Sequence, residues 1–160
     1  MPHIELSTFI AAPVTACYAL ALNVQAHVES AQQTGERVLA GPASGQLQLG
    51  DVVTWEGRHF GLRQRLTVRI TAATPPTHFR DEQVRGAFRW LRHDHYFEAV
   101  AGGTLMRDVF AFQSPVGFIG RLFEQLFLTR YLTNFLRQRN AVLKQMLEVE
   151  VSTSDWRNSE

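Results

Sequence analysis

Histidine and aspartate side chains that could do chemistry lie on predicted strands in the middle of the chain. His93 and His95 are two residues apart, and Asp108 follows on the next predicted strand. Because side chains alternate across a strand, the two imidazoles share one face, with their backbone positions about 6.6 Å apart. The same alternation puts His59 on the more apolar face of residues 52–60. The three histidines and Asp108 are therefore predicted to face the interior of the fold.

Three kinds of chemistry fit this set. Two histidines and a carboxylate from a neighbouring strand can ligate zinc or iron. A histidine oriented by an aspartate can act as a general base, so His95 and Asp108 are the candidate catalytic pair for proton abstraction from a carbonyl compound. The third reading is a buried hydrogen-bond network, or polar anchors for the head of an apolar ligand. We favour anchoring, because ligand pockets combine apolar walls with a few convergent polar groups.

We expect neither a bound metal nor a cofactor. The chain has no phosphate-cradling glycine loop followed by lysine, no serine nucleophile elbow and no C-x-x-C motif. Any enzymatic activity is therefore expected to be cofactor-independent. The alternation of the strands and the terminal helix supply the candidate ligand-binding residues. These are Trp55, His59, Leu91, His93, His95, Met106, Asp108, Phe110, Phe112, Tyr131 and Phe135.

The elements that must position these residues follow from periodicity. Residues 4–10 alternate between apolar and polar, which predicts a strand. Pro13 begins a predicted helix that ends near Leu22, and Asn23 caps a second one that ends near Ser30. Six more strands are predicted from alternation and from turn residues about ten positions apart. Their ranges are 36–40, 52–60, 62–73, 77–84, 87–99 and 103–113.

A terminal helix is predicted from Pro115 to about Glu148, but its apolar residues do not form one stripe. Ile119, Leu122, Phe123 and Leu126 fall on one side of the helix, at about 100° per residue. Leu128, Tyr131, Phe135, Val142 and Met146 fall on the other side. We expect the helix to break near residues 127–129. The alternative is that the first stripe packs against a second subunit, which leaves a homodimer open.

The order of these elements resembles the helix-grip superfamily (START- and Bet v-like, SRPBCC), which includes the birch-pollen allergen and the StAR-related lipid-transfer domains. More narrowly, five segments are similar to its bacterial polyketide cyclase/dehydrase-like ligand-binding subgroup. They read HVESAQQTGERVLAG, VTWEGRHFGLRQRLTVRI, FRDEQVRGAF, HDHYFEAVAGGTLMRDVFAF and PVGFIGRLFEQLFLTRYLTNFLRQRN. The similarity covers Ile4 to about Leu147, which is essentially the whole domain.

The resemblance implies an α+β helix-grip fold, in which a curved antiparallel sheet of about seven strands wraps around the long C-terminal helix. It also implies a cavity between the two, with His27 near the cavity mouth. We expect this cavity to bind a small hydrophobic ligand, lipid-like or polyketide-like. The alternative is a cyclase or dehydratase that uses His/Asp acid–base chemistry. Glu36, at the start of a strand, is expected to pair with surface charges.

Composition sets the remaining expectations. With 160 residues, 45% of them hydrophobic and 19% charged, the chain fits one domain at residues 1–150 and a flexible tail at 151–160. Its 16 basic and 15 acidic residues nearly cancel, so no general attraction to nucleic acid is expected. No apolar run reaches the roughly 18 residues that span a bilayer, so no stable membrane insertion is expected. Cys17 is the only cysteine, which favours a cytoplasmic location.

Overall fold

The computed structural model describes residues 2–115 and 117–157, and its centre is one antiparallel sheet. The strands are β1 (His3–Ile10), β2 (Arg37–Ala40), β3 (Val52–His59), β4 (Leu62–Thr74), β5 (His78–Arg85), β6 (Trp90–Val100) and β7 (Gly103–Gln113). They lie in the order β1-β7-β6-β5-β4-β3-β2. Each strand from β2 onward pairs with the next strand in the chain, and β1 closes against β7.

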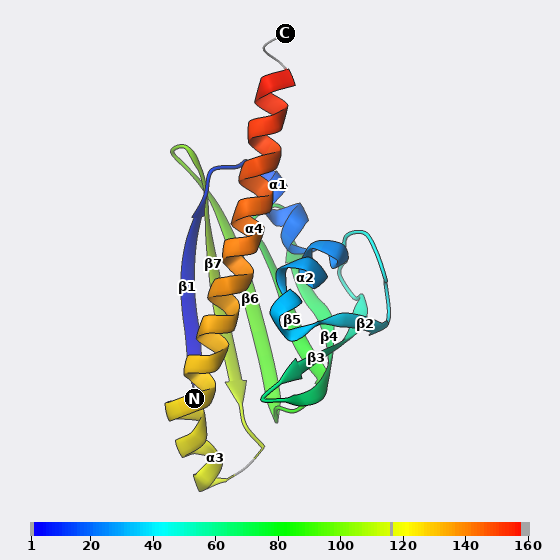
Figure 1. Ribbon diagram of the computed structural model, residues 1–160, viewed down its shortest axis with the longest axis vertical. Coiled ribbons are helices and arrows are strands. Elements are labelled where there is room, and N and C mark those ends of the chain that lie inside the picture. The colour runs from blue at the N-terminus through cyan, green and yellow to red at the C-terminus, as the bar shows by residue number, and fades with distance from the viewer. Residues whose placement is uncertain (1, 116, 158–160) are drawn as a thin grey trace.

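Two short helices connect β1 to β2, and helical residues follow β7. The helices are α1 (Val14–Ala21), α2 (Val24–Ser30), α3 (Phe118–Phe123) and α4 (Thr129–Arg157), with a 3-10 turn at Gln32–Thr34 and a π-helical turn at Glu124–Leu128. Asn23 caps α2 as expected, because its side chain accepts a hydrogen bond from the Ala26 N–H at 2.9 Å. Figure 1 shows α4 crossing the sheet, with α1 and α2 beside it. The predicted α+β helix-grip class is confirmed.

The core fills the space between the sheet and the helices in two clusters. The larger one packs apolar side chains of β3 to β7 against α1 and α2, and the smaller one joins β1, β6 and β7 to α4. In α4 the most buried apolar residues are Leu132, Leu136, Leu143 and Leu147. Each lies one position after a residue of the stripe predicted from periodicity. Periodicity therefore predicted the buried side of α4 with an error of one residue position. The error arises because the apolar arc of α4 is broad, and packing decides which part of it is most buried.

The helical segment after β7 is irregular where a break was predicted. Instead of ending near residue 127, the helix widens into a π-helical turn and continues as α4 to Arg157, beyond the expected end near Glu148. A π turn contains an extra residue, which rotates the side chains before it relative to those after it. Residues 151–157 of the expected tail are helical, and residues 158–160 lie outside the described part of the chain.

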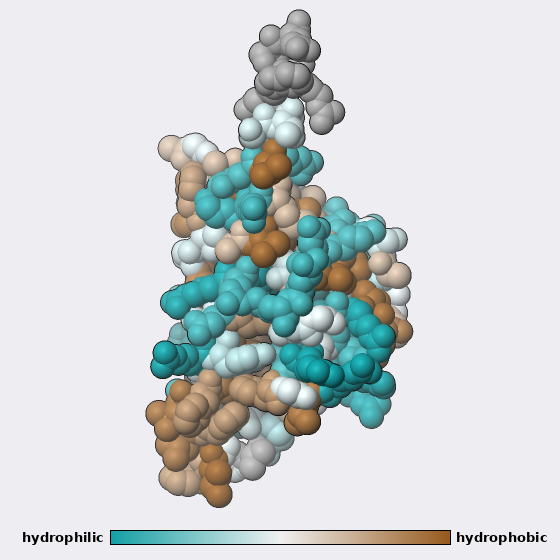
Figure 2. All heavy atoms as spheres, in the orientation of Figure 1, coloured by the Kyte–Doolittle hydropathy of each residue, from teal (hydrophilic) through white to brown (hydrophobic). Residues whose placement is uncertain are grey.

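The apolar stripe of α3 and the π turn is largely exposed in the described part of the chain. Ile119, Leu122, Phe123 and Leu126 are between 44% and 79% exposed. Figure 2 shows hydrophobic residues gathered at the lower end of the molecule, where Figure 1 places α3. The first half of the terminal helix therefore turns its apolar side chains away from the core, and the alternative that this stripe packs against a second subunit stays a prediction. Among the described helices, none is long and apolar enough to cross a bilayer.

Candidate functional site

A cavity of about 170 Å³ lies between the concave face of the sheet and α4. Its walls are mainly apolar and aromatic side chains from β3 to β7 and from α4. Eight of the predicted ligand-binding residues line it: Trp55, His59, Leu91, His93, His95, Phe110, Tyr131 and Phe135. Strand alternation therefore identified the cavity-facing side of β3, β6 and β7, because the orientation of a strand side chain is a local property.

The other three predicted residues lie deeper than the cavity wall. Met106 and Phe112 are almost completely buried in the two core clusters, and Asp108 is fully buried beneath the histidines. All three are on β7, which pairs with β1, and β1 in turn contacts α4. The rest of the fold therefore covers these three inward side chains of β7, whereas Phe110 of the same strand lines the cavity. Met106, Asp108 and Phe112 therefore do not line this cavity, and their direct contact with a ligand stays a prediction.

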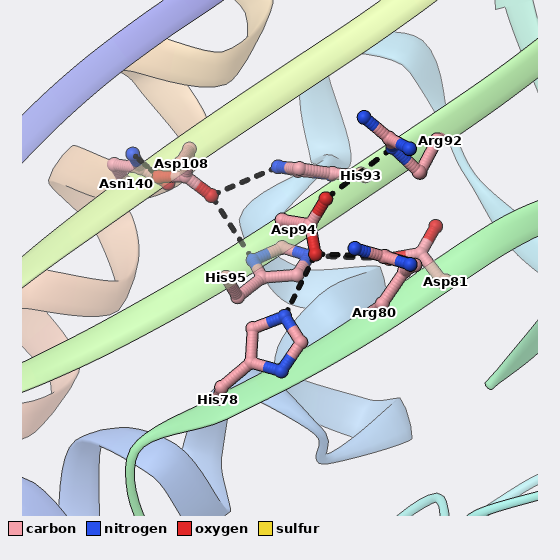
Figure 3. Close-up of polar contacts among 9 residues, drawn as sticks. All are labelled: His78, Arg80, Asp81, Arg92, His93, Asp94, His95, Asp108 and Asn140. Carbon is pink, nitrogen blue, oxygen red and sulfur yellow. Dashed lines mark hydrogen bonds and ion pairs between the residues drawn. The ribbon is translucent and has the colours of Figure 1, made fainter. Parts of the chain in front are cut away.

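The buried polar cluster is centred on His95 and spans three strands (Figure 3). His95 Nδ1 lies 3.0 Å from Asp108 Oδ1, and His95 Nε2 lies 3.1 Å from Asp81 Oδ1. The sheet register produces this arrangement, because His95 pairs with Asp108 across β6 and β7, and Asp81 pairs with His93 across β5 and β6. An imidazole with a carboxylate at each nitrogen is arranged to donate from both, which favours its protonated form.

Asp108 also holds the second histidine and a helix side chain. Its Oδ1 accepts a hydrogen bond from His93 Nε2 at 2.9 Å, and its Oδ2 accepts one from Asn140 Nδ2 at 2.6 Å. Asn140 belongs to α4, so this carboxylate connects the helix to the sheet. Burial alone would raise the pKa of Asp108, but the hydrogen bonds from His93 and His95 outweigh it and hold the pKa well below its usual range.

The two histidines have opposite pKa shifts although their rings are only 3.7 Å apart, centroid to centroid. Burial and the positive charge of His95 lower the pKa of His93 to about 4, despite its bond to Asp108. Burial also works against protonation of His95, but there the bonds to Asp108 and Asp81 prevail and raise the pKa. Near neutral pH the cluster therefore contains a neutral His93 beside a His95 that favours its proton.

A second polar group lines the cavity on β3 and the turn before β2. His59 Nδ1 lies 2.8 Å from the Tyr131 hydroxyl, and His27 Nε2 lies 2.7 Å from Glu36 Oε2. Glu36 is largely buried and its Oε1 also lies 3.7 Å from His59 Nε2. Gly57 makes room for it, because a Cβ there would lie 2.8 Å from Glu36 Cγ.

Glu36 was therefore wrongly expected to pair with surface charges. Burial would raise its pKa, but the bonds to His27 and His59 lower the pKa to about 2, so Glu36 stays ionised at neutral pH. His27 lines the cavity, as the resemblance implied, and its ring stacks on Trp55 at 3.9 Å between centroids. The cavity thus carries two polar groups, one around His95 and one around Glu36.

A further carboxylate cluster lies on the opposite face of β6. Asp94 Oδ1 accepts hydrogen bonds from His78 Nε2 at 2.7 Å and from Arg80 Nε at 2.8 Å, and Arg92 Nε lies 3.5 Å from Oδ2 (Figure 3). The side chains of Arg80 and Arg92 help to bury Asp94 almost completely, although this face of the sheet is otherwise exposed to solvent. This cluster ties β5 to β6 from outside, and none of its residues lines the cavity.

Asp81 and Arg139 are charged cavity residues that were not predicted from the sequence. Asp81 shares a face with the buried Phe79 in β5, so alternation within the predicted strand 77–84 contained the signal for it. Arg139 lies on the buried side of α4, three residues after Leu136. An arginine in an apolar helix stripe looks like a surface residue in sequence, so only the packing of α4 reveals its position.

The residues that could hold a metal ion are Asp81, His93 and His95, whose ligand atoms lie within 4.8 Å of one another. Both ring nitrogens of His95 already face carboxylates, and the guanidinium of Arg139 acts electrostatically on Asp81 and His95. A metal cation would compete with these positive groups for the same carboxylates. The arrangement is better suited to a hydrogen-bond network, and the absence of a metal stays a prediction.

Comparisons with known proteins identify the fold. No protein-family profile matches the chain, and no curated protein matches it in sequence. Among solved structures, the protein TTHA0849 from Thermus thermophilus has a TM-score of 0.77 and 15% identity, over 93% of this chain and 99% of its own. A START superfamily protein from Mycobacterium smegmatis has a TM-score of 0.70 and 11% identity, over 91% and 97%. The ginseng (Panax ginseng) major latex-like protein 151 has a TM-score of 0.67 and 15% identity, over 91% and 97%.

These identities are low, but the aligned lengths are nearly complete on both sides. The similarity therefore extends over the sheet, the two short helices and the terminal helix together. With the strand order and the position of α4, it confirms the resemblance drawn from the sequence at the level of the fold. The chain has the helix-grip fold of the START superfamily and the latex-like proteins.

Proposed function

We propose that the protein binds a small, largely hydrophobic molecule, lipid-like or polyketide-like, in the cavity between the sheet and α4. The observation that carries this proposal is the composition of the cavity wall. Trp55, Leu66, Val68, Leu91 and Phe110 supply apolar surface from four strands, and polar groups occur at only a few places. Ligand sites in proteins have this composition, because apolar burial supplies affinity and a few polar groups set orientation.

The polar groups of the cavity are held in place before any ligand arrives. The Tyr131 hydroxyl is fixed by His59, and His95 is fixed between two carboxylates. Such groups lose little conformational freedom on binding, so they orient a ligand at low entropic cost. The fold shared with a START superfamily protein supports the same proposal.

A cavity-filling substitution tests the proposal. Val68 is buried on the cavity wall, so Val68→Phe should occupy ligand space, whereas Val84→Phe on the exposed part of β5 should not. Each protein is purified from its own host and examined by native mass spectrometry. We expect wild type and Val84→Phe to retain a small molecule and Val68→Phe to lose it. A molecule retained equally by all three proteins would place binding elsewhere, and none in any of them would contradict the proposal.

A second candidate function is a cyclase or dehydratase acting on a polyketide-like substrate. The specific observation in its favour is that His93 and His95 border the cavity with pKa values shifted in opposite directions. Enzymes separate the pKa values of neighbouring groups in this way to provide an acid and a base at one pH. Here His95 would be the acid, oriented by Asp108, and the neutral His93 the base.

Replacement of His95 by glutamine separates the two functions. An enzyme with the His95→Gln substitution should retain ligand and lose turnover of a polyketide-like carbonyl substrate. A binding protein should lose affinity and show no turnover even as wild type. Binding is measured by calorimetry and turnover by product analysis on the same preparations, so that each protein gives both values.

A further inference from the structure

Arg139 is a buried cationic side chain inside the cavity. It lies on α4, is 5% exposed and lines the cavity together with Asp81, His93 and His95. Its electrostatic influence on Asp81 and His95 shows that the guanidinium is close to the polar cluster. A guanidinium keeps its positive charge in proteins, so this part of the cavity carries a fixed cation.

This cation has no direct partner in the described part of the chain. Its Nε atom is buried without a hydrogen bond, and no ion pair of Arg139 is found within residues 2–115 and 117–157. Asp81 is the carboxylate on which Arg139 acts electrostatically, and its Oδ1 already contacts His95. Burying an unpaired charge is costly, and proteins normally pair such groups. A partner supplied by the ligand would remove this cost.

We propose that Arg139 binds the carboxylate of the ligand, so that the protein selects hydrophobic monocarboxylic acids. The inference rests on the proposed function and specifies the class of ligand for the same cavity. A guanidinium can donate two parallel N–H bonds to a carboxylate, which matches its planar shape. Trp55, Leu91 and Phe110 would then receive the apolar body of the acid.

The charges around Arg139 limit the ligand to a single negative charge. Asp81 and Asp108 carry two negative charges, and His95 and Arg139 carry two positive ones, so the cluster is balanced before a ligand binds. Arg139 is the one of these two cations whose Nε has no hydrogen bond among the described residues, so a single carboxylate can pair with it directly. A phosphate monoester carries about two charges at neutral pH, so it would add a second negative charge to the same cavity.

Matched acids and amides test the inference. The probes are two pairs of an acid and its amide: 4-phenylbutanoate with 4-phenylbutanamide, and octanoate with octanamide. Each probe is titrated calorimetrically into wild type, Arg139→Met and Arg137→Met. The titrations are done at about pH 7.5, where the acids are ionised. Arg137 lies on the exposed side of the same helix and controls for the loss of a positive charge. We expect wild type and Arg137→Met to bind the acids at least about 10-fold more tightly than the amides. In Arg139→Met the acids should weaken at least about 10-fold while the amides keep their affinity.

The outcomes separate this inference from the proposed function. If acids and amides bind wild type equally, and Arg139→Met changes neither, the carboxylate assignment is overturned while ligand binding stands. If none of the four probes binds wild type, the proposed function and the inference both fail.

Thermal unfolding with and without octanoate supplies an independent measurement. Octanoate should raise the midpoint of wild type and of Arg137→Met more than that of Arg139→Met, and equal shifts in all three proteins would overturn the inference. If Arg139→Met does not fold, Arg139→Lys replaces it in the test. Lysine keeps the positive charge but cannot donate two parallel N–H bonds to a carboxylate, so Arg139→Lys should bind the acids more weakly than wild type. Equal binding would overturn the inference.

Discussion

Replacement of His93 by glutamine should remove a defined part of the acid sensitivity of the fold. The pKa of His93 is lowered from 6.5 to about 4, mainly by burial and then by the charge of His95. Between these two values the unfolded chain binds a proton at this position and the folded chain does not. Stability therefore falls as pH falls, by roughly 1.4 kcal/mol per pH unit. From about pH 6.5 to about pH 4.5 wild type should lose about 2 kcal/mol through His93.

This pH window isolates His93 from the other shifted groups. His95 has a raised pKa, so its contribution is fully present below about pH 6.5 and is lost only as pH rises through its folded pKa. Asp81, Asp108 and Glu36 have lowered pKa values, so their contributions are present above about pH 4.5 and are lost below it. Glutamine can still donate an N–H bond to Asp108, but it cannot take up a proton.

The assay is urea unfolding of wild type, His93→Gln and a control, His3→Gln, at about pH 6.5, 5.5 and 4.5, which span the window. His3 is an exposed residue of β1 and lies outside the buried cluster. From the highest to the lowest pH, the free energy of unfolding of His93→Gln should rise by about 2 kcal/mol relative to that of wild type. His3→Gln should follow wild type. Equal pH dependence of wild type and His93→Gln would refute the explanation by burial.

Three further changes follow from the same geometry. Asp108→Asn should lower the free energy of unfolding by about 3–5 kcal/mol near neutral pH, measured in urea, because His95 loses the more deeply buried of its two carboxylates; a change below about 1 kcal/mol would contradict this. Glu36→Gln should cost about 3 kcal/mol near neutral pH, and the difference from wild type should shrink as pH falls from 4.5 to about 2, through the pKa of Glu36; a difference independent of pH would contradict it. Wild type should sediment as a dimer and Phe123→Glu as a monomer, because Phe123 belongs to the exposed apolar stripe of α3 and the π turn. Monomers in both cases would exclude the homodimer.

Much of the candidate site could be predicted because its residues lie on strands. Alternation is a local property, so His59, His93 and His95 were assigned to the cavity face without knowledge of the sheet. The same argument placed Asp108 inward but could not give its depth. Depth depends on the closure of β1 against β7 and on the contact of α4 with β1. The expectations about the catalytic pair, the bound ligand and the cellular location stay predictions.

Residues in helices and turns were harder to place. Glu36 precedes β2, and its burial depends on the absence of a side chain at Gly57 and on contacts with His27 and His59. Arg139 is a charged residue, so the sequence predicts a solvent-exposed side chain. Its position on α4 buries it instead. Such positions depend on contacts between segments that are distant in sequence, and neither periodicity nor composition reports those contacts.

The sequence by itself determined the kind and order of the elements, the face of each strand and the two-stripe character of the terminal helix. These properties depend on backbone geometry and on side chains within a few residues of one another. Only the tertiary structure decided that Asp81 and Asp108 meet at His95, that Asp108 is bound by Asn140, and that Arg139 faces the cavity without a partner among the described residues. The physical reason is that strand register and helix docking are settled by the packing of the whole core, in which each contact depends on all the others.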